Sequence, residues 1–159
     1  MAVKVTPVPN RLGTLLRKPG GISRDMALAA AGHNVERLRE EFVGAIPGEI
    51  AALEELLAAC GAGNVSPDIL DAMLRRAGQI LTLSGTYGYY PLDTVVKRFC
   101  DLAIGMIEKK IGDAAPVGVH LRAMRLVCPG APELPPDEIA DMLAGLSRVH
   151  AHYGVGREG

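Results

Sequence analysis

Apolar residues recur along most of the chain at intervals of three and four positions, the spacing of amphipathic α-helices. This spacing predicts helices over residues 23–46, 49–60, 66–87, 92–111, 117–127 and 137–153. No segment alternates apolar and polar residues in the way that a half-buried β-strand does. Short loops rich in Gly and Pro separate the expected helices. We therefore predict an all-α fold with an antiparallel four-helix bundle at its centre and an additional N-terminal helical arm.

Individual residues mark where several of these helices begin or break. Ser23 and Ser66 are suitable N-caps, and Pro67 follows Ser66 at the first helical position. Pro47, followed by Gly48, is expected to kink or break the first long helix. Proline lacks the amide hydrogen that the helical ladder needs, and its ring clashes with the preceding turn.

The 159 residues correspond to about one domain. We expect an irregular arm over residues 1–21, where Pro and Gly are frequent, and a single helical-bundle domain over residues 22–153. Residues 154–159 are expected to form a flexible tail, because chain ends fray unless packing holds them.

Composition and charge exclude several classes of partner. Hydrophobic residues make up 48% of the chain but aromatic residues only 4%, so Leu, Ala, Val, Ile and Met must build the core. The 17 basic and 18 acidic residues leave a net charge of -1, so no strong field attracts nucleic acid. The sequence has neither the apolar run of about 18 residues that a membrane span needs nor a signal peptide at its N-terminus. We expect a cytoplasmic protein that binds neither nucleic acid nor membrane.

No catalytic or metal-binding motif is present. The sequence lacks G-x-S-x-G, Walker A, H-E-x-x-H and G-x-G-x-x-G. Cys60, Cys100 and Cys128 are widely spaced and are interpreted as small buried hydrophobic residues. His150 and His152 are two apart on a helix, so they do not share a face and do not predict a metal site. We expect no enzymatic activity, no metal and no cofactor.

The most informative segment is residues 77–93, AGQILTLSGTYGYYPLD. Gly78, Thr82 and Gly85 recur at +4 and +3, so they form one strip of small residues along a helix. A glycine inside a helix costs about 1 kcal/mol relative to alanine, a cost that close packing against the backbone can offset. The close neighbour is either another helix of the same bundle or the surface of a partner protein.

This segment resembles the histidine-phosphotransfer (HPt) domain of bacterial phosphorelays, especially the alphaproteobacterial form. The family motif runs Ala-His-x-Leu/Ile-Lys-Gly, then small residues, then Gly-Thr-Phe-Gly-Tyr-Pro-Leu. The matching residues here are Ala77, Ile80, Gly85-Thr86-Tyr87-Gly88-Tyr89 and, after Tyr90 as one apparent insertion, Pro91-Leu92. Weaker similarity extends to residues 20–23 and 119–126, so the resemblance covers most of the chain thinly and residues 77–92 well.

The resemblance places Gly78 where the family carries its phosphorylated His, Leu81 where it carries Lys, and Thr82 where it carries Gly. Phosphotransfer needs an imidazole nitrogen as the covalent carrier, and Gly78 has no side chain. Leu81 also removes the charge that would neutralise the phosphoryl group. The resemblance therefore implies a non-catalytic pseudo-HPt protein that binds a receiver domain or a histidine kinase in two-component signalling. The expected docking residues are Gly78, Gln79, Leu81, Thr82, Gly85 and Tyr87.

Two alternatives remain open. His120, in an apolar helix, is either a partly buried packing residue or a displaced phosphoacceptor in an active phosphotransfer protein. Ala123 and Met124 stand where the family context around a phosphoacceptor has Lys and Gly. The other alternative is a bundle whose resemblance is only architectural and which serves homo-oligomer assembly or binds an apolar ligand.

Overall fold

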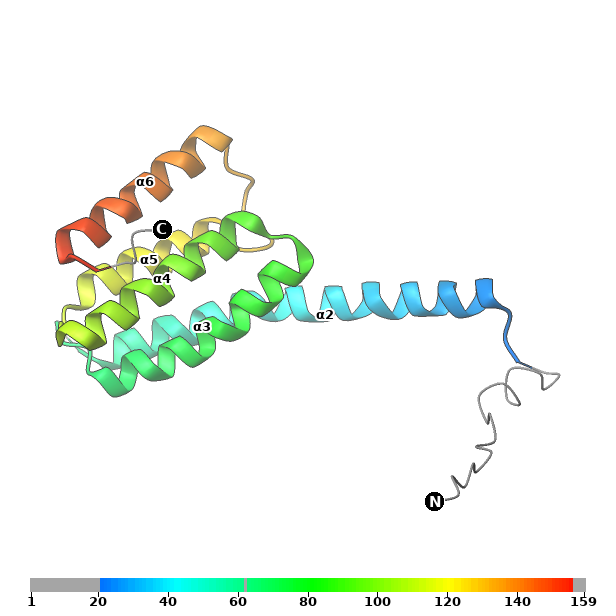
Figure 1. Ribbon diagram of the computed structural model, residues 1–159, viewed down its shortest axis with the longest axis horizontal. Helices are drawn as coiled ribbons and strands as arrows, with labels where there is room; N and C mark the ends of the chain where they lie inside the picture. Colours follow the sequence, from blue (N-terminus) through cyan, green and yellow to red (C-terminus); the bar gives the residue numbers. More distant parts are fainter. Residues whose placement is uncertain (1–20, 62, 156–159) are drawn as a thin grey trace, which may run out of the picture. The chain divides into compact units, whose positions relative to one another are not determined.

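The computed structural model describes residues 21–61 and 63–155 (Figure 1). This part of the chain contains five α-helices and no strand, which confirms the all-α prediction. The helices are α2 (Arg24–Ala59), α3 (Pro67–Tyr87), α4 (Tyr90–Lys109), α5 (Ala114–Leu126) and α6 (Pro136–Tyr153). One isolated bridge joins Asn64, before α3, to Asp113, before α5.

The chain divides into two compact units, Met1–Leu38 and Arg39–Gly159. In the first unit, the described residues 21–38 are all exposed. Met26 and Val35 are 62% and 60% exposed, so the apolar stripe that the spacing predicted along this helix is not buried. The predicted irregular arm lies outside the described residues, apart from Gly21.

The second unit is a helical bundle with an aliphatic core. The part of α2 after Leu38 contributes Ile46, Ile50 and Leu53, and α3 contributes a stripe that repeats every three or four residues. That stripe is Leu70, Met73, Ala77, Ile80 and Ser84. Phe99 of α4 is fully buried among these aliphatic side chains. The core is therefore built mainly from aliphatic side chains and Met, as the composition of the sequence predicted.

Capping residues fix the ends of several helices, and Ser66 with Pro67 begins α3 as the sequence predicted. The Ser66 hydroxyl accepts a hydrogen bond from the Ile69 amide at 3.4 Å, and Pro67 is the first residue of α3. Gly88 ends α3 with a left-handed φ of 78°, which glycine adopts without strain. Helix α5 begins three residues earlier than predicted, because the Asp113 carboxylate accepts a hydrogen bond from the Ala115 amide at 2.8 Å.

The break expected at Pro47 does not occur, and α2 continues through it from Arg24 to Ala59. Ile46 and Ile50, on either side of Pro47, are fully buried. Their burial holds the turns of the helix directly before and after Pro47 in the core of the bundle. Arg125 of α5 adds a hydrogen bond from Nη1 to the Pro47 carbonyl oxygen at 3.3 Å. Packing in this segment overrides the local preference of proline.

Packing also extends past the expected start of the flexible tail. Val155 is buried, and it lies against Gly105 of α4. Lys109 of α4 donates a hydrogen bond to the Gly154 carbonyl oxygen. These contacts hold Gly154 and Val155 against the bundle, whereas residues 156–159 lie outside the described part of the chain.

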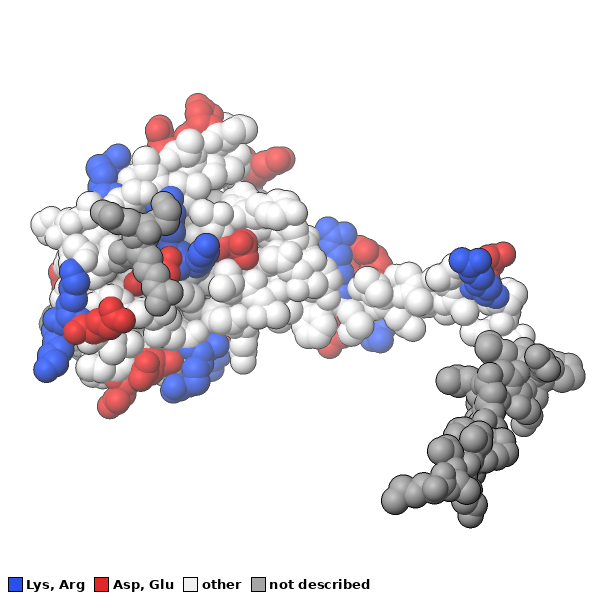
Figure 2. Space-filling model, viewed as in Figure 1, with Lys and Arg blue, Asp and Glu red and all other residues white. Residues whose placement is uncertain are grey.

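None of the helices in residues 21–61 and 63–155 combines the length and the apolar character that a bilayer span requires. Acidic and basic side chains are mixed over the face of the bundle that Figure 2 shows. That mixture agrees with the near-zero net charge of the sequence.

Candidate functional site

The small-residue strip of α3 faces out of the core. Ala77 and Ile80 point inward and are fully buried, whereas Thr82 and Gly85 are exposed and Gly78 is half-buried. A Cβ added to Gly78 would meet no atom of the described structure within 4 Å outside its own helix turn. Close packing against another helix of this bundle therefore does not account for Gly78.

Gly85 is the member of the strip that does have a close neighbour. A Cβ at this position would lie 3.2 Å from Oδ1 of Asp93, in the first turn of α4. The Asp93 carboxylate in turn accepts a long hydrogen bond, 3.5 Å, from the buried Ser84 hydroxyl. Small size at position 85 thus allows α4 to begin close to the end of α3.

The threonines near the strip use their hydroxyl groups within the helix. Thr82 Oγ1 donates to the Gly78 carbonyl oxygen at 2.9 Å, and Thr86 Oγ1 donates to the Thr82 carbonyl oxygen at 2.7 Å. These hydroxyl groups already have partners, so the strip needs no further polar contact from them. The strip therefore presents small side chains, and a partner that binds it can approach the backbone of α3 closely.

Two of the six expected docking residues contribute less surface than the sequence implied. Leu81 is half-buried and packs against the hydrophobic core. The ring of Tyr87 stacks on Phe42 of α2, with ring centroids 6.5 Å apart and an angle of 26° between the planes. The structure therefore brings Gly78, Thr82 and Gly85 together on one open surface with exposed Gln79 beside them, while Leu81 and Tyr87 form its border.

His120 lies on another helix and is closed to solvent. Its side chain in α5 is 0% exposed. Nδ1 lies 2.8 Å from the Pro116 carbonyl oxygen, and Nε2 lies 3.1 Å from Nε2 of His150. Burial lowers the pKa of His120 to about 4. Because both ring nitrogens are engaged in the interior, a phosphoryl donor cannot reach them in this conformation, and the packing interpretation is the one the geometry supports.

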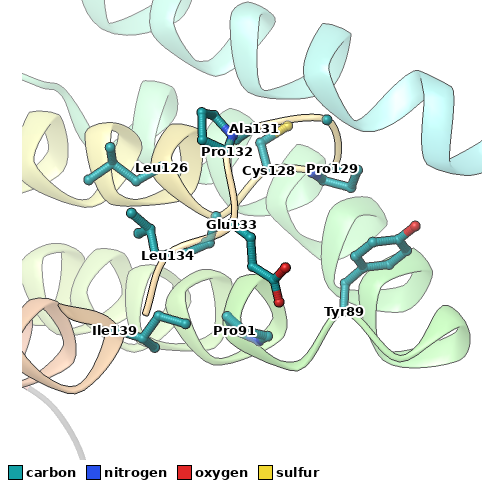
Figure 3. A pocket seen from close by; sticks show the side chains of 12 residues that line it. Tyr89, Pro91, Leu126, Cys128, Pro129, Ala131, Pro132, Glu133, Leu134 and Ile139 are labelled. Carbon is teal, nitrogen blue, oxygen red and sulfur yellow. The ribbon is translucent and has the colours of Figure 1, made fainter. Parts of the chain in front are cut away.

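A groove of about 310 Å³ opens near the turn from α3 to α4, between the start of α4 and the segment that joins α5 to α6 (Figure 3). Tyr89, from the turn after α3, and Pro91, in the first turn of α4, line one side, and Leu126 and Leu134 line another. Among the described residues that line the groove, Glu133 is the one that carries a charge. The groove lies at the surface of the bundle, and most of the residues that line it are apolar.

The three cysteines lie in or against the hydrophobic core. Cys128 is buried and Cys60 and Cys100 are half-buried, all as free thiols. Burial raises the pKa of the Cys100 thiol to about 11, so it is not an activated nucleophile. Over the residues that the structure describes, no three side chains of His, Cys, Asp or Glu lie close enough to share a metal ion.

The resemblance to HPt domains rests on the residues of α3 and the turn that follows it, and these now have a defined place in an all-α bundle. No family model, curated protein or solved structure matches this chain.

Proposed function

We propose that this chain is a non-catalytic pseudo-HPt protein that binds a receiver domain or a histidine kinase in two-component signalling. One observation carries the proposal. The segment that resembles the HPt motif lies on a helix of an all-α bundle, with Gly78 and Thr82 turned away from the core. In an HPt domain, the corresponding face carries the phosphorylated His and meets the receiver.

The absence of phosphotransfer in this proposal follows from the residues at the strip. Gly78 offers no nucleophile, and Leu81 offers no positive charge for a phosphoryl group. The buried His120 is on α5 and is hydrogen-bonded on both sides of its ring. The protein then acts by occupying or sequestering its partner, and the partner's phosphoryl group is not consumed.

The chemistry of the strip indicates what kind of contact the partner makes. Its side chains are uncharged; of the two arginines that precede it, Arg76 is paired with Glu49 at 2.8 Å and Arg75, three residues before Gly78, is exposed. Salt screens interactions between charges, so a contact that involves few charges should be weakened little by added salt. A flat apolar helix face or a close backbone segment of the partner fits a surface built on two glycines and a threonine.

The substitution Thr82→Arg tests the docking surface. Thr82 is exposed, so an arginine there can extend into solvent and the melting temperature should stay nearly unchanged. The long charged side chain covers the strip, so the affinity for the partner receiver domain should fall at least tenfold. Calorimetric titration with receiver domains and kinases from the same genome measures the affinity, and Ala140→Arg on the exposed face of α6 is the matched control.

Equal binding by wild-type protein and Thr82→Arg would refute docking at the strip. A strong loss of thermal stability in Thr82→Arg would show that the strip is covered within the bundle. Loss of binding in both Thr82→Arg and Ala140→Arg would indicate a general charge effect and would also contradict the proposal.

A further inference from the structure

Helix α6 is held to the bundle by an apolar contact and by several polar contacts. Leu146 is its one buried residue, and Met142, Leu143 and Tyr153 pack half-buried against the core. Arg98 of α4 donates from Nη1 to the Leu143 carbonyl oxygen at 3.0 Å and also to the Ser147 hydroxyl. Because Leu146 is the one residue of α6 that is buried, the polar contacts add to the apolar packing that keeps α6 in place.

A pair of histidines joins α6 to α5. His120 Nε2 and His150 Nε2 are 3.1 Å apart, and the two ring centroids are 5.2 Å apart. The Pro116 carbonyl oxygen next to His120 Nδ1 can only accept, so Nδ1 carries the hydrogen. His120 Nε2 is then an acceptor, and His150 Nε2 must supply the hydrogen between the rings.

Protonation of both imidazoles is incompatible with this arrangement. A proton on His120 Nε2 removes the acceptor and sets two N–H groups against each other at 3.1 Å. The charged groups that face the pair come from α4, namely Arg98, whose guanidinium opposes a second positive charge, and Asp101, which favours one on His150, as does a hydrogen bond of His150 to the Arg98 backbone. Where α5 meets α6, the titratable groups are the two imidazoles and, beyond them, Tyr153 of α6, whose hydroxyl donates a hydrogen bond to the carboxylate of Asp113 at the N-cap of α5. The Phe99 ring, 6.4 Å from the His120 ring, offers no hydrogen bond to a new proton.

We propose that His120 and His150 form an acid-sensitive latch that holds α6 on α4 and α5 at neutral pH and releases it when both imidazoles are protonated. This latch is independent of the docking strip on α3. It gives the bundle a second state, in which the faces of α4 and α5 that α6 covers become accessible.

The direction of the pH dependence follows from the two states. In the released state both imidazoles have the ordinary pKa near 6.5. In the docked state burial lowers the pKa of His120 to about 4, and burial together with Arg98 lowers that of His150. The released state therefore binds more protons as the pH falls below about 6.5, and docking weakens down to about pH 4. Each imidazole contributes up to about tenfold per pH unit, so the pair contributes up to about 100-fold.

Amide hydrogen exchange of the full chain from pH 7 to pH 4, corrected for the intrinsic pH dependence of exchange, tests the latch. In wild-type protein the opening constant of α6 should rise steeply, by up to about 100-fold per pH unit, while α3 stays protected. His120→Gln and His150→Gln should each reduce the slope to at most about tenfold per unit. The double variant should show no slope from pH 7 to about pH 5, because glutamine can donate and accept without titrating; nearer pH 4 the hydrogen bond from Tyr153 to Asp113 adds a slope of its own, because the pKa of Asp113 is lowered in the docked state. His152→Gln, at an exposed position on the same helix, should behave as wild type.

Simultaneous opening of α6 and α3 would mean global acid unfolding and would overturn the latch. A wild-type α6 without pH dependence, or a double variant with the wild-type slope, would overturn it as well. If His120→Gln fails to fold, His150→Gln decides, because its amide still donates to His120 Nε2 and a reduced slope is then expected from the loss of one titrating group.

Discussion

Two glycines inside helices of this bundle differ in their surroundings. A Cβ at Gly78 would have no neighbour within 4 Å outside its helix turn, whereas a Cβ at Gly105 would lie 2.7 Å from the Cβ of Val155. Glycine at position 78 therefore destabilises the helix entropically, and no close packing inside the described bundle offsets that cost. Gly105 allows the chain after α6 to approach α4 closely.

Gly78→Ala should raise the free energy of unfolding by about 0.5–1 kcal/mol, because alanine restricts the unfolded chain and fits the open site. Gly105→Ala should lower it by about 1–3 kcal/mol, because Val155 must move away. Urea denaturation followed by far-UV circular dichroism measures both changes. A loss of stability in Gly78→Ala would mean that the site is covered, and an unchanged Gly105→Ala would mean that Val155 does not pack on α4.

At the level of residues, the sequence predicted correctly those features that depend on the spacing within a single helix. The spacing predicted Ala77 and Ile80 for the buried stripe of α3, and both are buried; it left open whether Gly78 and Thr82 face another helix or a partner, and the structure turns them away from the core. The apolar neighbours of His120 indicated burial but not its partner. His150 lies 30 positions further along the chain, and no local pattern reports a contact over that distance. The stack of Tyr87 on a residue of α2 was unpredictable for the same reason.

At the scale of elements, α2 shows a conflict between local preference and packing. Proline in a helix interior costs about 3 kcal/mol relative to alanine. The continuous helix from Arg24 to Ala59 shows that burial of Ile46 and Ile50 outweighs that cost. Helix existence and most boundaries were predictable from spacing and caps, because those signals are local. Continuity through Pro47 was not, because it depends on which residues the rest of the bundle covers.

Pro47→Ala should raise the free energy of unfolding by about 2 kcal/mol. Restoring the amide hydrogen and removing the ring clash stabilises the folded state by about 3 kcal/mol. The greater flexibility of the unfolded chain without proline lowers this gain by up to about 1 kcal/mol. Thermal and urea denaturation measure the difference. Pro67→Ala is the matched control: Pro67 opens α3, where the amide has no partner inside the helix, so no gain is expected there. Equal effects at both positions would show that Pro47 does not strain α2.

The contact between α2 and α5 adds an electrostatic element to this packing. Arg125 Nε and Nη2 donate to the two carboxylate oxygens of Glu54 at 3.0 and 2.7 Å. This bidentate pair lowers the pKa of Glu54. Its contribution to stability is therefore present above the ordinary carboxyl pKa and is lost as the pH falls. Both side chains are more than a third exposed, so solvent screening limits that contribution to about 1 kcal/mol or less.

At the scale of the whole molecule, the proposed function requires that the bundle keeps the docking geometry of an HPt domain after losing its chemistry. Wild-type protein should take no phosphoryl group from a phosphorylated receiver. Gly78→His restores the missing imidazole at a position with room for it, and Leu81→Lys restores the positive charge one turn later. Leu81 is half-buried, and a lysine there can lay its methylene chain along the core and extend its ammonium group to solvent.

The double variant Gly78→His/Leu81→Lys should therefore accept phosphate from the receiver that binds the wild-type strip. An imidazole nitrogen attacks the phosphorus atom of the receiver's aspartyl phosphate, the bond to the carboxylate oxygen breaks, and the aspartate is regenerated while the imidazole loses a proton. Radiolabel that is stable to base and labile to acid should appear on the double variant. It should be absent from wild-type protein and from Leu81→Lys alone, which lacks the nucleophile. Adding Thr82→Arg to the double variant should abolish the label, because transfer requires docking.

A folded double variant that binds the receiver and remains unlabelled would show that the partner approaches in a geometry other than that of phosphotransfer. That outcome would contradict the pseudo-HPt proposal and leave a binding function intact. Label on wild-type protein would contradict the non-catalytic proposal directly, and loss of that label in His120→Ala would assign the transfer to the buried histidine of α5.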